Sequence, residues 1–310
     1  MKSLGTDLHN LFLGKPLSLL DTPPSLLGPQ KTPFSLAAVR AQATQIKSML
    51  NETSGPKRGS LICLIGKPGI GKSSFAQEFP DPDTIIEPRD QGVLDLASEG
   101  LIRTKTDRIF LSSTYGAYLS NLSASINGTC KTIICESLKG LCSLCNDHCS
   151  ATDHGGDYSP RSFLNFQQGP IQAAEKYFQA LIDMMLRAQN LGKHVILIGH
   201  SRSVAQDNKT GEDWLADTLE CDKRVAAIVH GSFTNIFHIV DAVPTERRQG
   251  KTKATSDTSR WMYVNVNPHY LAKNRMGLVG EIEFPSSPKA AYLSYCSAAK
   301  RDPKTGYKLA

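Results

Sequence analysis

From about residue 60 onward, short apolar runs alternate along the chain with segments whose apolar residues recur at helical spacing. Strands buried in a parallel sheet have such continuous runs, rich in β-branched residues, and four are found at 61–65, 84–86, 132–135 and 195–198. A long helix is predicted between the last two, over 171–190. Further strands are predicted at 225–229, 237–240 and 261–266. The pattern therefore predicts an α/β fold with a mostly parallel central sheet flanked by helices.

The beginning of the chain has a different pattern. Five prolines interrupt any long helix or central strand in the first 34 residues and predict an extended arm: Pro16, Pro23, Pro24, Pro29 and Pro33. Ser35 can then cap a helix whose apolar residues recur at helical spacing up to about Leu50. We expect this proline-rich arm plus helix to occupy residues 1–57. It docks on a neighbouring subunit, packs on its own domain or is partly disordered.

Composition restricts the class of protein. The chain has 310 residues, of which 40% are hydrophobic and 21% charged, as in a globular protein with a core of its own. No run approaches the eighteen or so apolar residues that a membrane span needs, and Asp7 and His9 interrupt the start too early for a secretory signal. We therefore expect a cytoplasmic protein without a membrane partner. The formal net charge of +6 is compatible with a polyanionic partner but too small to indicate one.

The cysteines cluster once, in a C-x2-C-x2-H-C run formed by Cys142, Cys145, His148 and Cys149. These four residues could be zinc ligands. The spacing of three and then four also places the three thiols on one stripe of a helix, as small apolar residues facing a core would be. Burial is the favoured interpretation, because closed zinc sites usually recruit ligands from two separated segments. The sequence alone leaves metal binding open.

The strongest chemical signal is the octet Gly66–Ser73, which fits G-x-x-x-x-G-K-S and stands between a predicted strand and a predicted helix. Glycines let the backbone amides of such a loop point inward around the β-phosphate of a nucleotide. Lys72 would bridge the β- and γ-phosphates, and Ser73 would offer its hydroxyl to Mg²⁺. ATP and Mg²⁺ are thus the expected cofactors. The expected contacts to the nucleotide come from the loop and the start of the helix, namely Gly66, Pro68, Gly69, Ile70, Gly71, Lys72, Ser73 and Ser74.

Such a loop also needs a carboxylate for the metal and a group that aims the attacking water. Glu136 follows the predicted strand 132–135 and is the candidate metal ligand, although Asp is usual there. Glu87 and Asp90 follow the strand 84–86, and we prefer Asp90 as the catalytic acid. His200 ends the strand 195–198, where it could sense the γ-phosphate or serve only as a structural histidine.

Five segments together carry a family resemblance, which covers roughly residues 58–285: 66–73, 85–92, 134–138, 198–200 and 272–278. The chain resembles the phage and bacterial RecA-like P-loop ATPases of the AAA-type nucleotide-binding group, which includes phage single-strand annealing and recombination proteins. The group belongs to the RecA, RadA and replicative-helicase superfamily. The last segment is similar to its K-x-R-x-G element, whose cations reach the nucleotide site of the adjacent subunit. Carried over, these cations are Lys273 and Arg275.

The resemblance implies a RecA-like ATPase core over 58–285, followed by a basic C-terminal tail over 286–310. It implies a homo-oligomer that hydrolyses ATP and acts on single-stranded DNA in recombination, annealing or replication, with phage or host recombination and replication proteins as possible partners. If the chain is phage-encoded, its compartment is the host bacterial cytoplasm. A P-loop phosphotransferase and a nucleotide-dependent scaffold with little turnover are the alternatives.

The resemblance also assigns the DNA-gripping loops to residues 149–169 and 202–219. The first loop mixes flexible, aromatic and basic residues that suit base stacking and phosphate contact: His154, Gly155, Gly156, Tyr158, Arg161 and Phe163. The second loop is richer in carboxylates and is a weaker candidate for an anion surface. Two further basic clusters are explained equally well by solvation or phosphate contact: Arg247, Arg248, Lys251 and Lys253, and Lys300, Arg301, Lys304 and Lys308.

Overall fold

A computed structural model describes residues 57–207, 211–242, 245–248, 251–254 and 259–309. These residues belong to one compact unit, Gly55–Ala310. The arm and helix expected at 1–57 lie outside the described residues except for Lys57. Among the residues that are described, no helix combines the length and the apolar character needed to cross a bilayer.

The centre of the molecule is a sheet with the strand order β11-β10-β7-β1-β5-β4-β2-β3, to which β6 adds by pairing with β5. A separate two-stranded hairpin is made by β8 and β9. The strands are β1 (Leu61–Gly66), β2 (Pro82–Ile86), β3 (Ile109–Leu111), β4 (Thr132–Glu136), β5 (His194–Gln206), β6 (Trp214–Leu219), β7 (Asn235–Ala242), β8 (Thr245–Arg248), β9 (Lys251–Ala254), β10 (Ser259–Tyr263) and β11 (Glu281–Glu283).

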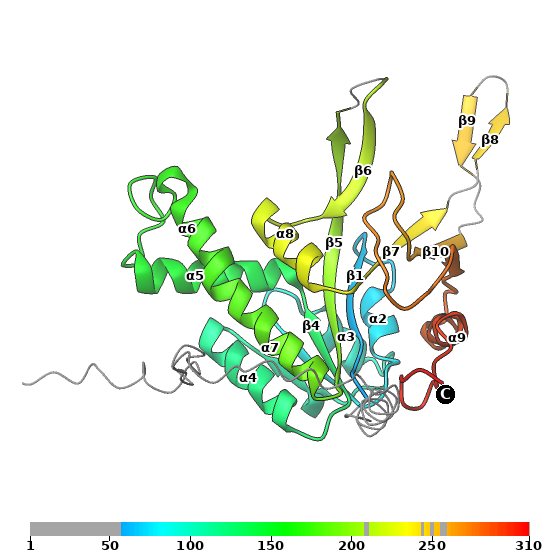
Figure 1. Ribbon diagram of the computed structural model, residues 1–310, viewed down its shortest axis with the longest axis horizontal. Coiled ribbons are helices and arrows are strands. Elements are labelled where there is room, and N and C mark those ends of the chain that lie inside the picture. The colour runs from blue at the N-terminus through cyan, green and yellow to red at the C-terminus, as the bar shows by residue number, and fades with distance from the viewer. Residues whose placement is uncertain (1–56, 208–210, 243–244, 249–250, 255–258, 310) are drawn as a thin grey trace, which may run out of the picture. The chain divides into compact units, whose positions relative to one another are not determined.

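Helices connect and cover these strands (Figure 1). They are α2 (Lys72–Ala76), α3 (Gly92–Ser98), α4 (Tyr115–Asn127), α5 (Leu138–Asp153), α6 (Gln168–Gln172), α7 (Gln179–Asn190), α8 (Lys223–Ser232) and α9 (Pro288–Ala298), with the 3-10 turns η1 (Thr106–Arg108) and η2 (Asn165–Gln167) and the π-helical segment η3 (Ala173–Phe178). The long helix expected at 171–190 is the continuous run α6, η3 and α7.

The α/β fold class is confirmed. The strands β7, β1, β5, β4, β2 and β3 pair in parallel, whereas β10 and β11 add antiparallel at one edge. The four runs first expected as parallel strands all lie in this part. Because parallel strands end at the same edge of a sheet, the residues at the carboxyl ends of β1, β2 and β4 come together there. His200 lies at the same edge but does not end its strand as expected, because β5 continues past it to Gln206.

Two apolar cores lie on opposite faces of the sheet. Successive residues of β1 enter different cores. Leu61, Cys63 and Ile65 face the helices α4, α5, α7 and α8. Ile62 and Leu64 face α2 and α9. Period-two alternation of this kind is what a strand covered on both faces requires. Figure 1 shows α4, α5 and α7 on one side of the sheet and α9 on the other. The central strand is thereby fixed from both sides, which makes its carboxyl end a rigid place for a site.

Two segments differ from the expectation. The strand expected at 225–229 is wrong, because this segment lies in α8. Asp222 caps that helix by accepting a hydrogen bond from the Arg224 N–H, and Val225 and Val229, four residues apart, are both buried on one helical face. Residues 286–310, expected as a basic tail, contain α9, whose Tyr295 is buried against the sheet.

Candidate functional site

The octet 66–73 forms the turn from β1 into α2 at the carboxyl edge of the sheet. Gly71 has φ 102°, a left-handed conformation that strains any residue with a side chain. Gly66 lies so close to β7 that a Cβ there would be 2.6 Å from the carbonyl oxygen of Ile239. The sequence thus needs glycine at both ends of the loop. The result is the strand, loop and helix that a phosphate-binding loop requires, and residues 66–73 are called the cradle below.

Lys72 is folded back into this loop. Its Nζ donates to the carbonyl oxygens of Gly66 and Lys67, at 2.8 Å and 2.7 Å, and lies 3.5 Å from Nδ1 of His200. Burial lowers the pKa of Lys72 to about 8, and the charges of Glu136 and Asp90 act against that shift. The ammonium group is therefore held inside the loop, where a phosphate can replace the weaker carbonyl contacts.

Glu136 and Ser73 meet across the cradle. The Ser73 hydroxyl donates to Oε1 of Glu136, and the buried Oε2 of the same carboxyl has no hydrogen-bond partner among the described residues. Burial raises the pKa of Glu136 to about 7, further raised by Asp90 and opposed by Ser73 and Lys72. A hydroxyl and a carboxylate oxygen with spare coordination fit the oxygen ligands of Mg²⁺. The extra methylene of Glu, compared with Asp, does not keep this carboxyl from reaching Ser73.

The raised pKa of Glu136 predicts a pH dependence of Mg²⁺-dependent ATP binding. A metal ligand must be deprotonated, so affinity should rise about tenfold per pH unit below the pKa near 7 and level off above it. It should fall again once Lys72 loses its proton above about 8. Affinity measured by calorimetry against pH checks this. Glu136→Gln should abolish the acid limb and keep the alkaline fall, and an unchanged acid limb in that variant would contradict the assignment.

The two carboxylates after β2 have different surroundings. Glu87 is buried and accepts hydrogen bonds from Nε and the backbone N–H of Arg89, at 2.6 Å and 3.0 Å. It also packs so closely on α5 that a Cβ at Gly140 would lie 2.8 Å from its own Cβ. The charge of Asp90, in contrast, acts on Lys72 and Glu136 in the cradle. The electrostatics thus favour Asp90 as the carboxylate available to the cradle.

His200 lies beside the cradle because β5 pairs with β1 in a register that sets it opposite Gly66. Its ring is half-buried, and burial together with the Lys72 charge lowers its pKa, while Asp90 acts against that shift. A neutral imidazole at this place can accept from the Lys72 ammonium group or donate to a phosphate oxygen. The structure therefore brings Lys72, Ser73, Glu136, Asp90 and His200 to one edge of the sheet.

The sequence reasoning missed one cation at the cradle. Arg260 of β10 donates from Nη1 to the carbonyl oxygen of Ile70 at 2.8 Å, and its guanidinium carbon lies 5.9 Å from the centre of the Phe284 ring. The same Nη1 would be 3.3 Å from a Cβ at Gly71. Arg260 thus holds the outer side of the loop from the same chain. It stands in no motif, so no local signal could have identified it.

Lys273 and Arg275 are not part of their own chain's cradle. Lys273 pairs with Ile236 near the amino end of β7 and donates from Nζ to the carbonyl oxygen of His230 at 2.7 Å. Arg275 is exposed, while its backbone N–H donates to the buried Asn235 side chain at 3.1 Å. The segment is therefore anchored to β7 with an outward-facing cation.

The cysteine run lies in α5. Cys145 and Cys149 are buried in the core and Cys142 is partly buried, as the helical spacing predicts. The His148 ring stacks on Tyr115 with 4.6 Å between ring centres. In the described part of the chain, no group of three or more His, Cys, Asp or Glu residues is placed to hold a metal ion.

The chain is similar to a family of known proteins. The family described as AAA domain matches the chain over residues 58–276. Among solved structures, the flagellar accessory protein FlaH from Methanocaldococcus jannaschii is similar at 15% sequence identity, with a TM-score of 0.35, over 84% of this chain and 96% of the FlaH chain. A search of the curated proteins gave no match.

Proposed function

Because the chain belongs to the AAA domain family and carries a P-loop cradle, we propose that it is an ATP- and Mg²⁺-dependent ATPase that works as an oligomer on single-stranded DNA, in recombination, annealing or replication. The observation that carries the ATPase part is the convergence of Lys72, Ser73, Glu136, Asp90 and His200 on one sheet edge. The DNA and assembly parts rest on the resemblance of the five sequence segments and on the surfaces described below.

In this proposal, the amides of residues 66–73 bind the phosphates of ATP, and the Lys72 ammonium group moves from its own loop carbonyls to the phosphate oxygens. Asp90 orients the attacking water and accepts its proton, and His200 contacts the γ-phosphate. When bound, Mg²⁺ would be held by Ser73 and Glu136 and would supply positive charge that stabilises the phosphate oxygens during hydrolysis.

Lys273 and Arg275 complete the site of an adjoining copy. Charge on the γ-phosphate oxygens is best stabilised by a guanidinium fork together with an ammonium group, and a neighbour that supplies them makes hydrolysis depend on assembly. The structure supports this role because Arg275 is exposed on a segment whose backbone is bonded to β7.

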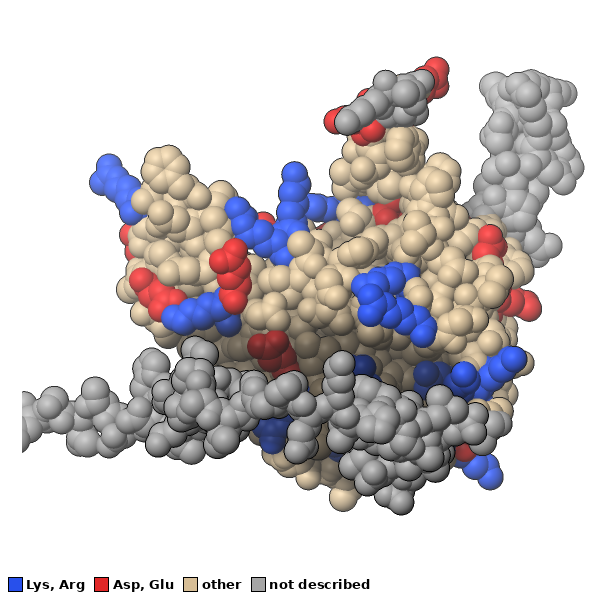
Figure 2. Space-filling model, viewed as in Figure 1, with Lys and Arg blue, Asp and Glu red and all other residues tan. Residues whose placement is uncertain are grey.

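The surface proposed for DNA is the segment 149–169 rather than the end of the β5–β6 hairpin. Phe163 is only 1% exposed, so the expectation that it stacks on a base is wrong. Phe166 is 88% exposed, and Arg161 of the same segment is also exposed, which gives one accessible aromatic face and one cation. The hairpin end is acidic, as Figure 2 shows, with Asp207, Glu212 and Asp213 exposed there.

The decisive experiment compares phosphate release with and without single-stranded DNA. We expect DNA to stimulate hydrolysis in the wild type, and we expect Arg275→Ala to lower the stimulated rate by about 10³-fold or more. The Arg275→Ala chain keeps an intact cradle, whereas a Lys72→Ala chain keeps an intact Arg275. In an equal mixture of the two variants, an interface is active only when an Arg275→Ala chain supplies the cradle and a Lys72→Ala chain supplies Arg275. Turnover should therefore return at about one interface in four.

The matched control is Arg187→Ala, which removes an exposed arginine of α7 and should leave the rate unchanged. Failure of DNA to stimulate the wild type would overturn the DNA part and favour a scaffold or a phosphotransferase. Failure of the mixture to recover would overturn the assignment of Arg275 to a neighbouring site.

A further inference from the structure

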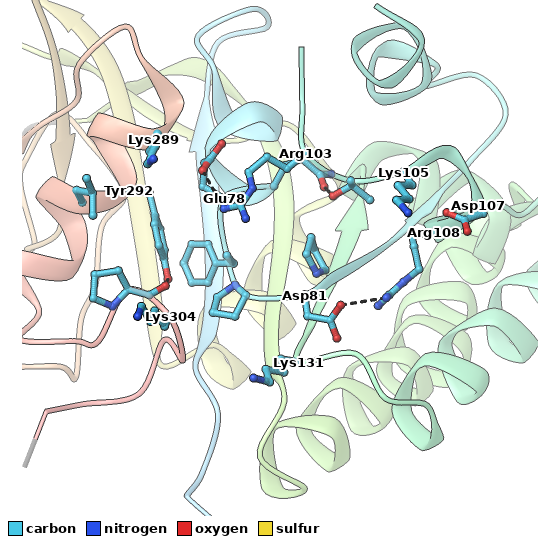
Figure 3. A pocket seen from close by; sticks show the side chains of 17 residues that line it. Glu78, Asp81, Arg103, Lys105, Asp107, Arg108, Lys131, Lys289, Tyr292 and Lys304 are labelled. Atoms are coloured by element: carbon cyan, nitrogen blue, oxygen red, sulfur yellow. Dashed lines mark hydrogen bonds and ion pairs between the residues drawn. The ribbon is translucent and has the colours of Figure 1, made fainter. Parts of the chain in front are cut away.

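A cavity of about 820 Å³ lies at the amino edge of the sheet, opposite the cradle. Its floor is the connection from α2 to β2, residues 77–82; one wall is the segment 103–108, and the other is α9 with residues 303–304. Figure 3 shows Lys289, Tyr292 and Lys304 on one side and Arg103, Lys105 and Arg108 on the other. None of the residues assigned to the ATP site lines it.

The cavity is deep enough for a small molecule. Gln77, Phe79, Thr104 and Tyr292 all line it although each is less than 8% exposed. Buried groups on the floor and on both walls show that this is a cleft rather than a flat surface. Its volume lies in the range of pockets that bind small ligands.

The lining is basic. Six cations face three carboxylates, a difference of +3: Arg103, Lys105, Arg108, Lys131, Lys289 and Lys304 against Glu78, Asp81 and Asp107. Two of the carboxylates already have partners, since Asp81 lies 3.0 Å from Arg108 and Glu78 lies 3.8 Å from Arg103. Lys131, Lys289 and Lys304 are exposed and come from three separate segments, with Lys289 and Lys304 on the same wall of the cleft.

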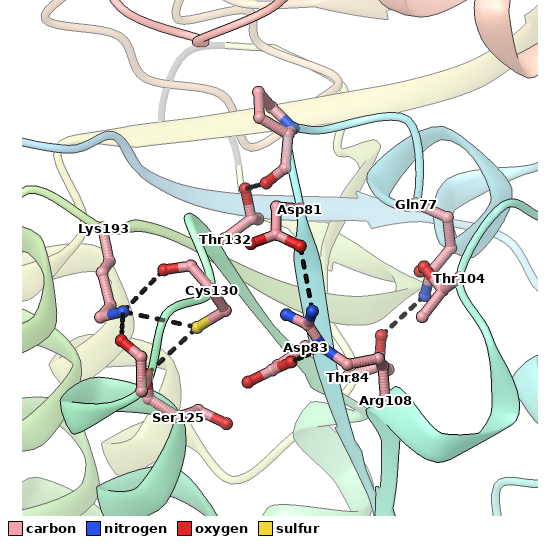
Figure 4. A network of polar contacts seen from close by, with 12 residues as sticks. Gln77, Asp81, Asp83, Thr84, Thr104, Arg108, Ser125, Cys130, Thr132 and Lys193 are labelled. Carbon is pink, nitrogen blue, oxygen red and sulfur yellow. Dashed lines mark hydrogen bonds and ion pairs between the residues drawn. The ribbon is translucent and has the colours of Figure 1, made fainter.

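The floor and one wall are held in place by polar contacts (Figure 4). Arg108 donates to Asp83 as well as to Asp81. The Gln77 amide donates to the Thr84 hydroxyl at 2.8 Å and accepts from Thr104. This network satisfies its own polar groups, so the cleft is formed before any ligand binds. Phe79, Pro80 and Pro82 add apolar side chains to its floor.

We propose that this amino-edge cleft is a second ligand site, which takes a nucleotide-sized molecule bearing two or more linked phosphate groups. The lysines on its facing walls bind the phosphates, and Phe79, Tyr292 and the neighbouring prolines contact the uncharged part of the ligand. The helix α2 joins the two sites, because Lys72 at its start lies in the cradle and Gln77 directly after its end lies at the floor of the cleft.

Equilibrium dialysis of the full chain against radiolabelled pyrophosphate tests the proposal. The wild type should bind a second pyrophosphate molecule in addition to the one in the cradle, and Lys72→Ala should abolish only the cradle site. The double variant Lys131→Gln/Lys304→Gln should weaken only the other site, by about tenfold or more. The control Arg187→Gln/Lys223→Gln removes the same charge from exposed positions on α7 and α8 and should keep both sites.

A parallel titration with ADP distinguishes the source of the phosphates. Tighter binding of ADP than of pyrophosphate at the second site indicates a nucleotide, and the reverse indicates an inorganic polyphosphate; both outcomes support the site. A single site lost in Lys72→Ala would overturn the proposal, as would equal weakening in the double variant and the control. Retained cradle binding in the double variant shows that this variant is folded. The test measures only pyrophosphate and ADP binding, so its result is independent of the DNA proposal.

Discussion

Replacement of Lys72 by alanine should lower ATP hydrolysis by about 10²–10³-fold, the cost of removing one preplaced charge from a reaction that develops charge on oxygen. Lys72 is 4% exposed, and its ammonium group lies 2.7–2.8 Å from two loop carbonyl oxygens. Without it, those oxygens face the cradle and repel the phosphates that Lys72 would otherwise attract. Steady-state phosphate release at saturating ATP and direct measurement of ATP affinity check this, and both should decrease.

The matched control for Lys72→Ala is Lys223→Ala on α8, an exposed lysine outside the cradle. It should hydrolyse ATP at the wild-type rate. Thermal unfolding of both variants separates lost chemistry from lost structure. A Lys72→Ala chain that keeps its fold and hydrolyses ATP within a few-fold of the wild type would contradict the role of the cradle.

The cradle could be predicted from sequence because all its defining residues lie in one octet. The backbone conformation of Gly71 and the placement of Lys72 follow from neighbours within a few positions. The carboxylate Glu136 and His200 were also predicted, because each ends an apolar run and parallel strands share a carboxyl edge. Local pattern and general sheet geometry were sufficient in these cases.

Other features depend on contacts that no local pattern encodes. Arg260 reaches the cradle only because β10 adds antiparallel to β7 and β7 lies beside β1. The segment 225–229 is apolar enough for a strand, and only the cap at Asp222 and packing against α7 decide for a helix. Phe163 was counted as accessible, although it packs between the Tyr158 and His154 rings. In each case the contact that determines the structure involves a residue outside the local sequence pattern, or a contact that this pattern does not reveal.

The sequence offered Glu87 and Asp90 as catalytic acids, and the structure supports a choice between them. A group that aims water must be free to accept a proton. Glu87 is 4% exposed, with its two oxygens engaged by Arg89. Asp90 is partly exposed, and its charge acts on Lys72, Glu136 and His200. We therefore expect the water to be oriented by Asp90, while Glu87 holds the turn after β2 against α5.

Accordingly, Asp90→Asn should lower kcat for ATP hydrolysis by about 10²–10⁴-fold with little change in ATP affinity, because the amide keeps the shape of the side chain but cannot accept the proton. Asp95→Asn at the exposed start of α3 makes the same chemical change away from the cradle and should be neutral. Glu87→Gln should act mainly on stability, since it weakens the contact to Arg89. If Glu87→Gln lost kcat at an unchanged melting temperature while Asp90→Asn stayed active, the two roles would have to be exchanged.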